Sequence, residues 1–393
     1  MKEIDANINI IGGGLVGSIA AYSLSKFGYK ISIIEKKKYY KNDSFKDNRT
    51  VAISEGTKGF LNKIGLWSDI SVYCEPIKNI KVVDRKLFNQ LDFDNIRRKS
   101  NLGYIIKNDY LLDIVYSKIK KKNNIKIFNN TKINNFKIVE DKIITNANKI
   151  KVYSDLNIAA DGKNSFVRKF FKTFSYTKNY KKSALVLILN HSKNHNSTAF
   201  ELFYKNGPLA ILPMRKINNK FCSSIVWTNE TEYLKNLLMV NEEKFKLILN
   251  NETQNCVGSV NKIISKQIFP ITAHLNSKFN EKKTVFVGDS AHSFHPIAGQ
   301  GWNLGMKDLS NLYNQILDYN RLGIEIGSDL FCKKYHDENY FNAYRLYQIT
   351  DKLDSVFKSN MPIISTVRSS GIKFINKNKK LKNLISDFAM GIS

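Results

Sequence analysis

The chain has few cysteines and no long apolar run, and each shortage excludes a class of protein. Its four cysteines, Cys74, Cys222, Cys256 and Cys332, lie far apart and form no CxxC pair. Neither a zinc ribbon nor a disulfide framework is indicated, and a reducing cytoplasm fits best. No apolar stretch reaches the roughly 18 residues that a membrane-spanning helix needs, and no signal peptide precedes the first strand. We expect a cytoplasmic protein, soluble or peripheral on the inner face of the cell membrane.

Arginine is scarce although the chain is strongly basic. The formal net charge is +28, yet only nine of the 62 basic residues are arginine, and the lysines are scattered among asparagine and isoleucine. A nucleic-acid groove more often has clustered arginines with interleaved aromatic rings, so we expect no nucleic-acid partner. Two explanations of the charge remain open. One is attraction to an anionic membrane surface, and the other is the drift of an AT-rich genome.

The six histidines show no metal-binding spacing. None stands in an HExxH or comparable ligand pattern, so no metal ion is expected. His292 and His295 flank a glycine-rich turn, where we expect them to form local hydrogen bonds or to contact a cofactor.

The first 35 residues predict a dinucleotide-binding unit. Strand, glycine turn, helix, strand and acid follow in this order: 7–11, Gly12-Gly14-Gly17, 18–27, 31–34 and Glu35. The three glycines suit a tight turn, the approach of a pyrophosphate to the helix start, and the close packing of helix on strand. Glu35 stands where this fold places the acid that binds a ribose hydroxyl. We therefore expect an adenine dinucleotide here.

A second glycine-rich stretch, 288–308, predicts a ligand site at the end of a strand. Residues 284–287 are typical of a buried parallel strand, and Gly288-Asp289 follow at its carboxyl end, where open α/β sheets bind ligands. Asp289 is expected to accept a hydrogen bond from a hydroxylated ligand. The alternative is a glycine-rich turn that binds nothing.

A helix start completes this second stretch. Pro296 ends regular structure, Gly299 and Gly301 allow close approach of the backbone to a ligand, and 302–312 has helical spacing. The free N–H groups at such a start favour a partial negative charge.

The remaining patterns place a second sheet in the middle of the chain. Helices are expected over 56–70 and 108–121 and after Asp308, and 80–93 is expected to be extended. Shorter strands are expected at 125–128, 132–139, 142–147 and 156–159. Four further strands, at 185–189, 200–204, 209–213 and 222–227, predict an antiparallel sheet separate from the nucleotide fold. Such a sheet is a reasonable wall for a substrate.

Three motifs in order resemble those of group A flavoprotein monooxygenases of the para-hydroxybenzoate hydroxylase fold, and within them the ubiquinone-biosynthesis hydroxylases. They are the GxGxxG with Glu35, the ADGxxSxxR-like 160–168 and the GDAAHxxxPxxGQGxNxGxxD-like 288–308. Smaller matches lie at 47–54, 61–67, 203–213, 226–227 and 350–357, so the resemblance covers essentially the whole chain.

The resemblance implies an α/β fold with interleaved parts. A Rossmann-like FAD-binding domain would comprise 1–75, 101–178 and 265–330. An antiparallel-sheet substrate domain would comprise 76–100 and 179–264, followed by a C-terminal helical region over 331–393.

The resemblance also implies which residues bind FAD. Glu35 would bind the adenosine ribose, Arg49 the pyrophosphate region and Asp289 the ribityl chain. The helix start would face the pyrimidine edge of the flavin, where about half a unit of positive charge stabilises the reduced ring. Asp161 and Arg168 belong to a motif tied to FAD and NAD(P)H, with a purely structural role as the alternative. The full set is Gly12, Gly14, Gly17, Glu35, Arg49, Asp161, Arg168, Gly288, Asp289, Pro296, Gly299, Gln300, Gly301, Trp302 and Asn303.

The implied reaction is ring hydroxylation of a polyprenylated phenol in ubiquinone biosynthesis. NAD(P)H would visit transiently, because no second GxGxxG unit is present, and O₂ would react through a C4a-hydroperoxyflavin. No catalytic side chain is identified, although His295, Pro296 and Trp302 lie near the expected site. Trp302 and Ser290 depart from the smaller residues usual in the family, and Trp302 would either narrow the site or fill a gap.

Three hypotheses remain open at this point. The first is the polyprenylphenol hydroxylase, with peripheral membrane contact or membership of a ubiquinone-synthesis complex. The second is a flavoenzyme of the same fold on another substrate: a small-phenol hydroxylase, an epoxidase or a polyprenyl reductase. The third is a basic scaffold or nucleic-acid protein without catalysis, which bound flavin would eliminate.

Overall fold

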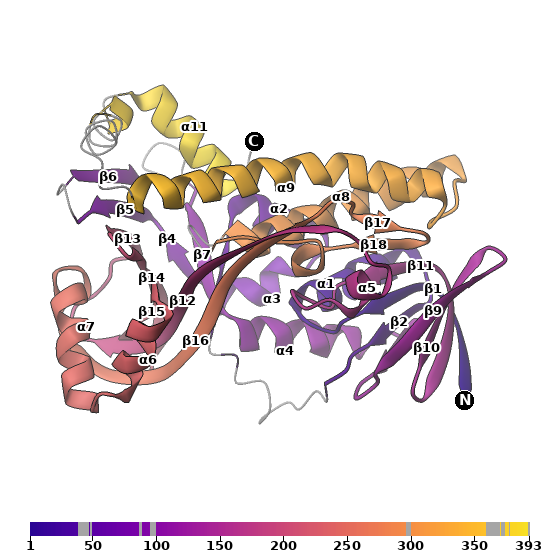
Figure 1. Cartoon of the computed structure of the whole chain (residues 1–393), viewed down its shortest axis with the longest axis horizontal. Coiled ribbons are helices and arrows are strands. Elements are labelled where there is room, and N and C mark those ends of the chain that lie inside the picture. Colours follow the sequence, from indigo (N-terminus) through magenta and orange to yellow (C-terminus); the bar gives the residue numbers. More distant parts are fainter. Residues whose placement is uncertain are drawn as a thin grey trace.

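A computed structural model describes residues 1–37, 47, 49–85, 89–94, 100–295, 300–358, 370, 374–376 and 378–391. Two eight-stranded sheets and one three-stranded sheet form its framework. Long helices run along one side of all three, and the C-terminus lies on that side (Figure 1). The predicted α/β fold is confirmed.

The first sheet is the expected nucleotide-binding unit. Its central strands run in the order β18-β11-β1-β2-β8, and every neighbouring pair among them is parallel. They are β1 (Lys2–Ile11), β2 (Ile31–Ile34), β8 (Ile125–Phe128), β11 (Ile150–Ala159) and β18 (Thr284–Phe286). Antiparallel β17 (Asn280–Glu281), β9 (Ile133–Val139) and β10 (Lys142–Ala147) complete it. Its interior strands are buried on both faces, as expected for a sheet that is covered on both sides. Most of the buried side chains are apolar, and the buried polar ones, such as Asn9, Ser32 and Asn157, hydrogen-bond to one another.

The helices of this unit lie where the sequence predicts them. The helix after the glycine turn is α1 (Leu15–Leu24), which continues as a 3₁₀ turn over Ser25–Phe27, and α4 (Asn108–Ile119) packs beside it. With this turn the helical segment ends at Phe27, where the sequence predicted its end. Short α5 (Phe166–Phe170) follows β11.

The second sheet is antiparallel except for one parallel pair, β13 with β5. Its order is β19-β16-β12-β15-β14-β13-β5-β6. The strands are β5 (Asn79–Asp84), β6 (Asn89–Asp94), β12 (Ser175–His191), β13 (Thr198–Tyr204), β14 (Gly207–Ile217), β15 (Lys220–Glu230), β16 (Val260–Asn276) and β19 (His292–Ser293). The four strands expected between 183 and 227 are all present and are longer than predicted.

Two helices that the sequence analysis did not predict cover one face of the second sheet. They are α6 (Thr231–Met239) and α7 (Glu242–Val257). Their apolar residues, among them Leu234 and Phe245, share a buried cluster with Leu202 and Ile211 of the sheet.

A small sheet, β3-β7-β4, lies between the larger two. It comprises β3 (Thr50–Ile53), β4 (Glu75–Ile77) and β7 (Gly103–Lys107), and α2 (Glu55–Lys63) and α3 (Trp67–Ser71) connect its strands. The helix expected over 56–70 is thus two helices, because Gly65, at φ +70°, ends the first one.

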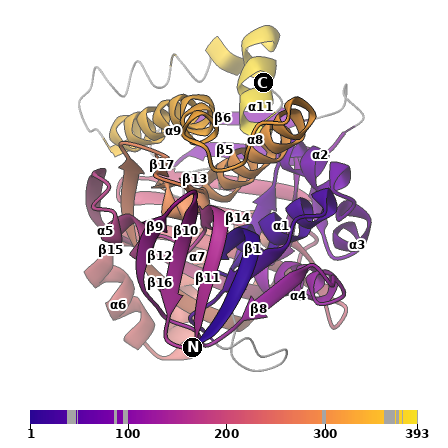
Figure 2. The ribbon, with the colours of Figure 1, turned by 90° about the vertical axis from the view of Figure 1, so that its right-hand side faces the viewer.

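The described residues of the C-terminal part are mainly helical, as expected. The helices are α8 (Gln300–Leu322), α9 (Asp329–Lys358) and α11 (Lys379–Met390). Seen from the end of the molecule, α8 and α9 lie above the strands of the first sheet (Figure 2). Among the described helices, none is long and apolar enough to cross a membrane.

Candidate functional site: a flavin cradle at the strand ends

The three motif glycines at the end of β1 have different surroundings. A Cβ at Gly12, whose φ is +104°, would lie 2.4 Å from the Ala160 carbonyl oxygen, and one at Gly17 would lie 2.0 Å from the Gly12 carbonyl oxygen. A Cβ at Gly14 would meet no other described atom within 4 Å. Gly12 and Gly17 are therefore required by packing, whereas Gly14 keeps open the space at the start of α1. That is the arrangement a pyrophosphate needs.

Glu35 lies beside this glycine loop. Its Oε2 accepts a hydrogen bond from the Gly13 N–H at 2.7 Å, and its Oε1 accepts one from the Lys37 N–H at 2.8 Å. A carboxylate held at the end of β2 in this way can bind ribose hydroxyls next to the loop. Tyr116 of α4 also lies against Gly13, and burial together with the charge of Glu35 raises its pKa to about 12. In the sequence Tyr116 is an ordinary position of the predicted helix over 108–121, and no local signal marks it as part of the site.

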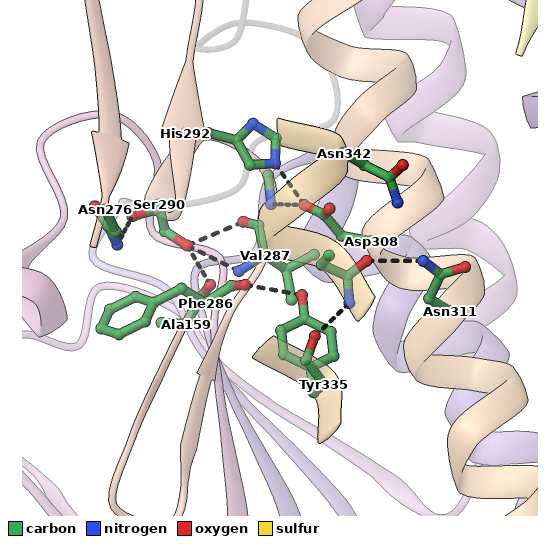
Figure 3. A network of polar contacts seen from close by, with 12 residues as sticks. Ala159, Asn276, Phe286, Val287, Ser290, His292, Asp308, Asn311, Tyr335 and Asn342 are labelled. Carbon is green, nitrogen blue, oxygen red and sulfur yellow. Dashed lines mark hydrogen bonds and ion pairs between the residues drawn. The ribbon is translucent and has the colours of Figure 1, made fainter. Parts of the chain in front are cut away.

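The turn after β18 is fixed by a buried polar network (Figure 3). Gly288, at φ +61°, donates its N–H to Asp308 Oδ2 at 3.0 Å. His292 Nε2 lies 2.7 Å from the same oxygen, and both side chains are at most 1% exposed. The Ser290 hydroxyl donates to the Ala159 carbonyl at the end of β11. The network thus ties the turn to α8 and to β11, and Ser290 has a structural role here.

Asp289 lies in the same turn, between Gly288 and Ser290. Its side chain is exposed, yet the surrounding protein is close enough that burial raises its pKa against the charges of His292, Arg49 and Lys163. A carboxylate that solvent can reach among several cationic groups is well placed to accept hydrogen bonds from ligand hydroxyls.

Arg49 lies near Asp289, at the start of β3. Its Nε and Nη2 donate to the two carboxylate oxygens of Asp47, both at 2.6 Å, and its guanidinium lies 5.1 Å from the ring centre of Phe269. The hydrogen bond to Asp47, and weaker attraction to Asp47 and Asp289, raise the pKa of Arg49. The side chain is half exposed, so a phosphate could replace solvent around it.

The start of α8 faces the same region. A Cβ at Gly301 would meet no other described atom within 4 Å, so a ligand can approach the backbone closely at this point. The Asn303 side chain accepts from the Ser54 N–H at 3.0 Å and the Thr57 hydroxyl at 2.9 Å, and it donates to the Ala52 carbonyl at 2.8 Å. Asn303 therefore fixes the helix start against β3 and α2.

Trp302 and His295 flank this helix start. Trp302 packs against the main core, and its indole N–H is buried without a hydrogen-bond partner in the described part of the chain. His295 is 2% exposed, and its ring packs edge-on against Tyr180 at 5.0 Å. Gln300 is the first residue of α8. The predicted site residues Pro296 and Gly299 lie outside the described residues.

Asp161 and Arg168 hold the loop after β11. Asp161 Oδ2 accepts from the N–H groups of Phe166 and Val167, and its buried Oδ1 has no hydrogen-bond partner among the described residues. Arg168 donates to the carbonyls of Ser290 and Lys163 at 3.0 and 2.6 Å. Burial raises the pKa of Asp161 and lowers that of Arg168. These contacts give both residues a structural role, and their contact with FAD or NAD(P)H stays a prediction.

The described residues fit an FAD molecule. Five features lie near the carboxyl ends of the parallel strands β1, β2 and β18 and the adjoining β3. They are the open space at Gly14, the carboxylates of Glu35 and Asp289, the half-exposed Arg49 and the start of α8. The carboxylates can accept hydrogen bonds from the ribose and ribityl hydroxyls. The N–H groups and the guanidinium can bind the pyrophosphate, and the positive end of α8 can stabilise the negative charge of the reduced ring.

Comparisons with known proteins agree with this geometry. Ubiquinone hydroxylase UbiL of Rhodospirillum rubrum is 28% identical over 389 residues, which cover 98% of this chain and 90% of that protein. The ubiquinone biosynthesis monooxygenase COQ6 of Dictyostelium discoideum is 25% identical over 461 residues, covering 100% of this chain and 92% of that protein.

A solved structure has the same fold. The p-nitrophenol 4-monooxygenase PnpA from Pseudomonas putida superimposes with a TM-score of 0.80 at 15% identity, covering 99% of this chain and 98% of that one. The family model described as the FAD binding domain matches residues 5–322. The chain therefore belongs to the FAD-binding domain family and is an FAD-dependent monooxygenase, as the sequence predicted.

Proposed function

We propose that the protein hydroxylates the aromatic ring of a polyprenylated phenol in ubiquinone biosynthesis, with NAD(P)H and O₂ as co-substrates. The observation that carries this proposal is the cradle of Gly14, Asp289 and the α8 start, which lies beside the second sheet. The names of the relatives, ubiquinone hydroxylase and ubiquinone biosynthesis monooxygenase, support the substrate class.

Each group of the cradle has an assigned task. Glu35 binds the adenosine ribose, Arg49 the pyrophosphate and Asp289 the ribityl chain, while N–H groups from Gln300 to Asn303 face the pyrimidine edge of the flavin. When bound, FAD supplies hydride acceptance and the activation of O₂. The protein contributes positioning, and the positive end of α8 stabilises negative charge on the ring.

Asp289 offers a direct test of the cradle. Asp289→Ala removes the acceptor for the ribityl hydroxyls, so the purified variant should contain much less flavin than the wild type. Asp141→Ala, in the exposed turn between β9 and β10, is the matched control. Full flavin content in Asp289→Ala contradicts the assignment.

The substrate class is tested by turnover. NAD(P)H oxidation and hydroxylated product are measured with 2-geranylphenol and with 4-hydroxybenzoate as probes. We expect the prenylated phenol alone to stimulate both. Stimulation by the short acid alone would favour a small-phenol hydroxylase, and a prenyl product without ring oxygen would favour an epoxidase or a reductase of the same fold.

The ring position is tested in cells. Strains blocked at single hydroxylation steps of ubiquinone synthesis are complemented with this chain, and the quinone intermediates are read by mass. Restoration in at least one strain is expected, and failure in every strain would refute the quinone assignment.

We also propose that the C-terminal region contacts an anionic membrane surface. Leu384 of α11 is 66% exposed and Phe374 is 60% exposed, beside the basic residues Lys380 and Lys382. Exposed apolar and basic side chains together favour the membrane interface. Co-sedimentation with vesicles that contain phosphatidylglycerol should fall with added salt and with Leu384→Ser. If added salt does not change vesicle binding, the proposed attraction between the basic residues and the anionic lipid is wrong.

A further inference from the structure

The second sheet has two faces of different character. Leu202 and Ile211 belong to the core under α6 and α7, whereas Ala199 and Met214 pack toward the small β3-β7-β4 sheet. Successive strand residues point to opposite faces. Glu201, between Phe200 and Leu202, therefore points to the inner face, the side away from α6 and α7.

Glu201 lies in a row of half-buried side chains on that inner face. It pairs with Val82 of β5 and Ala210 of β14, and Ala210 pairs with Val226 of β15. All four are half-buried, whereas Leu202 on the other face is 2% exposed. Val82, Ala210 and Val226 form what we call the apolar strip. With about 4.8 Å between strands, the row is about 14 Å long, which suits an aromatic ring with its first prenyl units.

A chain of contacts connects the inner face to the flavin cradle. Ala52 of β3 packs against the cluster that contains Ala199, and its carbonyl accepts from Asn303 at the start of α8. Thr50 donates to Ser224 of the inner face at 3.1 Å. The α8 start, β3 and the inner face are thus successive layers, and the apolar strip lies on the flavin side of its sheet.

The carboxylate of Glu201 exchanges its proton near neutral pH. Burial raises its pKa to about 7, and no charge among the described residues adds to or opposes this shift. Where β13 pairs with β5 and β14, Asp84 is the ionizable side chain that shares the inner face with Glu201. Neither Asp84 nor a described side chain of α9, which contacts β13 and β14, shifts this pKa. Above pH 7 the carboxylate is ready to accept a proton.

We propose that Glu201 is the catalytic group that accepts the phenol proton of the substrate. The proposal rests on the proposed function. The phenol O–H bond breaks, its electron pair stays on the oxygen, and a new O–H bond forms on the carboxylate. One negative charge moves from Glu201 to the phenol, and the ring becomes electron-rich. The apolar strip holds the prenyl chain beside it, and lacks a competing charge.

Turnover of the FAD-loaded enzyme tests the role. With 2-geranylphenol as probe, product formation in the wild type should rise with pH, with a midpoint near the pKa of Glu201. Glu201→Gln should lose that rise and form product about 100-fold more slowly at pH 8, the usual worth of a general base. Glu201→Asp should recover part of the rate. Glu230→Gln, exposed at the end of β15 in the same sheet, is the matched control.

Infrared titration gives a readout that does not depend on turnover. The wild type should show a protonated carboxyl band that disappears with a midpoint near pH 7 and that Glu201→Gln lacks. Binding of 2-geranylphenol should shift this midpoint, which a structural role would not do. If FAD-loaded Glu201→Gln keeps the wild-type pH profile, or if the wild type lacks this band, the role of Glu201 is wrong while the proposed function still stands. A wild type that never responds to the probe overturns the proposed function and the role together.

Discussion

Gly14→Val should separate cofactor binding from folding. The backbone at Gly14 has φ −70° and ψ −172°, an extended conformation that valine adopts readily. A Cβ there meets no other described atom within 4 Å, so the fold should persist. The side chain would occupy the space through which a pyrophosphate reaches the start of α1. Loss of two hydrogen bonds to a charged group, at about 1.5 kcal/mol each, predicts about 100-fold weaker FAD binding.

The assay compares flavin absorbance per protein and thermal unfolding by circular dichroism. Gly59→Val is the matched control, because a Cβ at Gly59 of α2 also meets no other described atom within 4 Å. It should keep both flavin and stability. Gly17→Ala should behave in the opposite way to Gly14→Val and lower the stability itself, because its Cβ would lie 2.0 Å from the Gly12 carbonyl oxygen. Wild-type flavin content in Gly14→Val would refute the placement of the pyrophosphate.

Three further changes test the surroundings of the cradle. Asp308→Asn keeps one carbonyl oxygen as acceptor for both the buried Gly288 N–H and the His292 ring. The free energy of unfolding, measured in urea, should fall by about 1–3 kcal/mol. An unchanged value would contradict the network of Figure 3. His274 has its pKa lowered to about 3, chiefly by burial, so the unfolded chain binds the extra proton as pH falls below 6.5. His274 should therefore contribute a loss of about 1.4 kcal/mol of unfolding free energy per pH unit there, and the pH dependence of unfolding should be shallower in His274→Gln than in the wild type; equal slopes would contradict this. Trp302→Leu should change the relative turnover of different phenols while flavin content stays constant, and loss of flavin would show that its role is to hold the cofactor.

The nucleotide unit was predictable because its signals are local. Residues 31–34 and 125–128 are short segments rich in isoleucine, and their predicted bounds equal those of β2 and β8. β1 begins at Lys2, earlier than the predicted strand at 7–11, because its first half alternates exposed charged residues with Ile4 and Ala6. That half is held by pairing with β11, which the sequence does not display.

The missed elements and contacts depend on tertiary structure. β16 alternates exposed and half-buried residues over much of its length, and its strand character comes from pairing with β12. Asp308 was a motif position, but its two donors become apparent only when the turn packs on α8. In the sequence Glu201 is a single acidic residue within a predicted strand, and its raised pKa arises from burial, which only the fold reveals.

The ladder between β12 and β16 limits how this protein can open. The two strands have 17 residues each and pair from the turn beside the cradle to the region under α7, with three register shifts along the way. In Figure 1 they form one continuous curved ribbon across the molecule. A rotation of one half against the other would have to break or bend this ribbon. We therefore expect substrate entry and product release to use movements of short segments rather than a rotation of one half against the other.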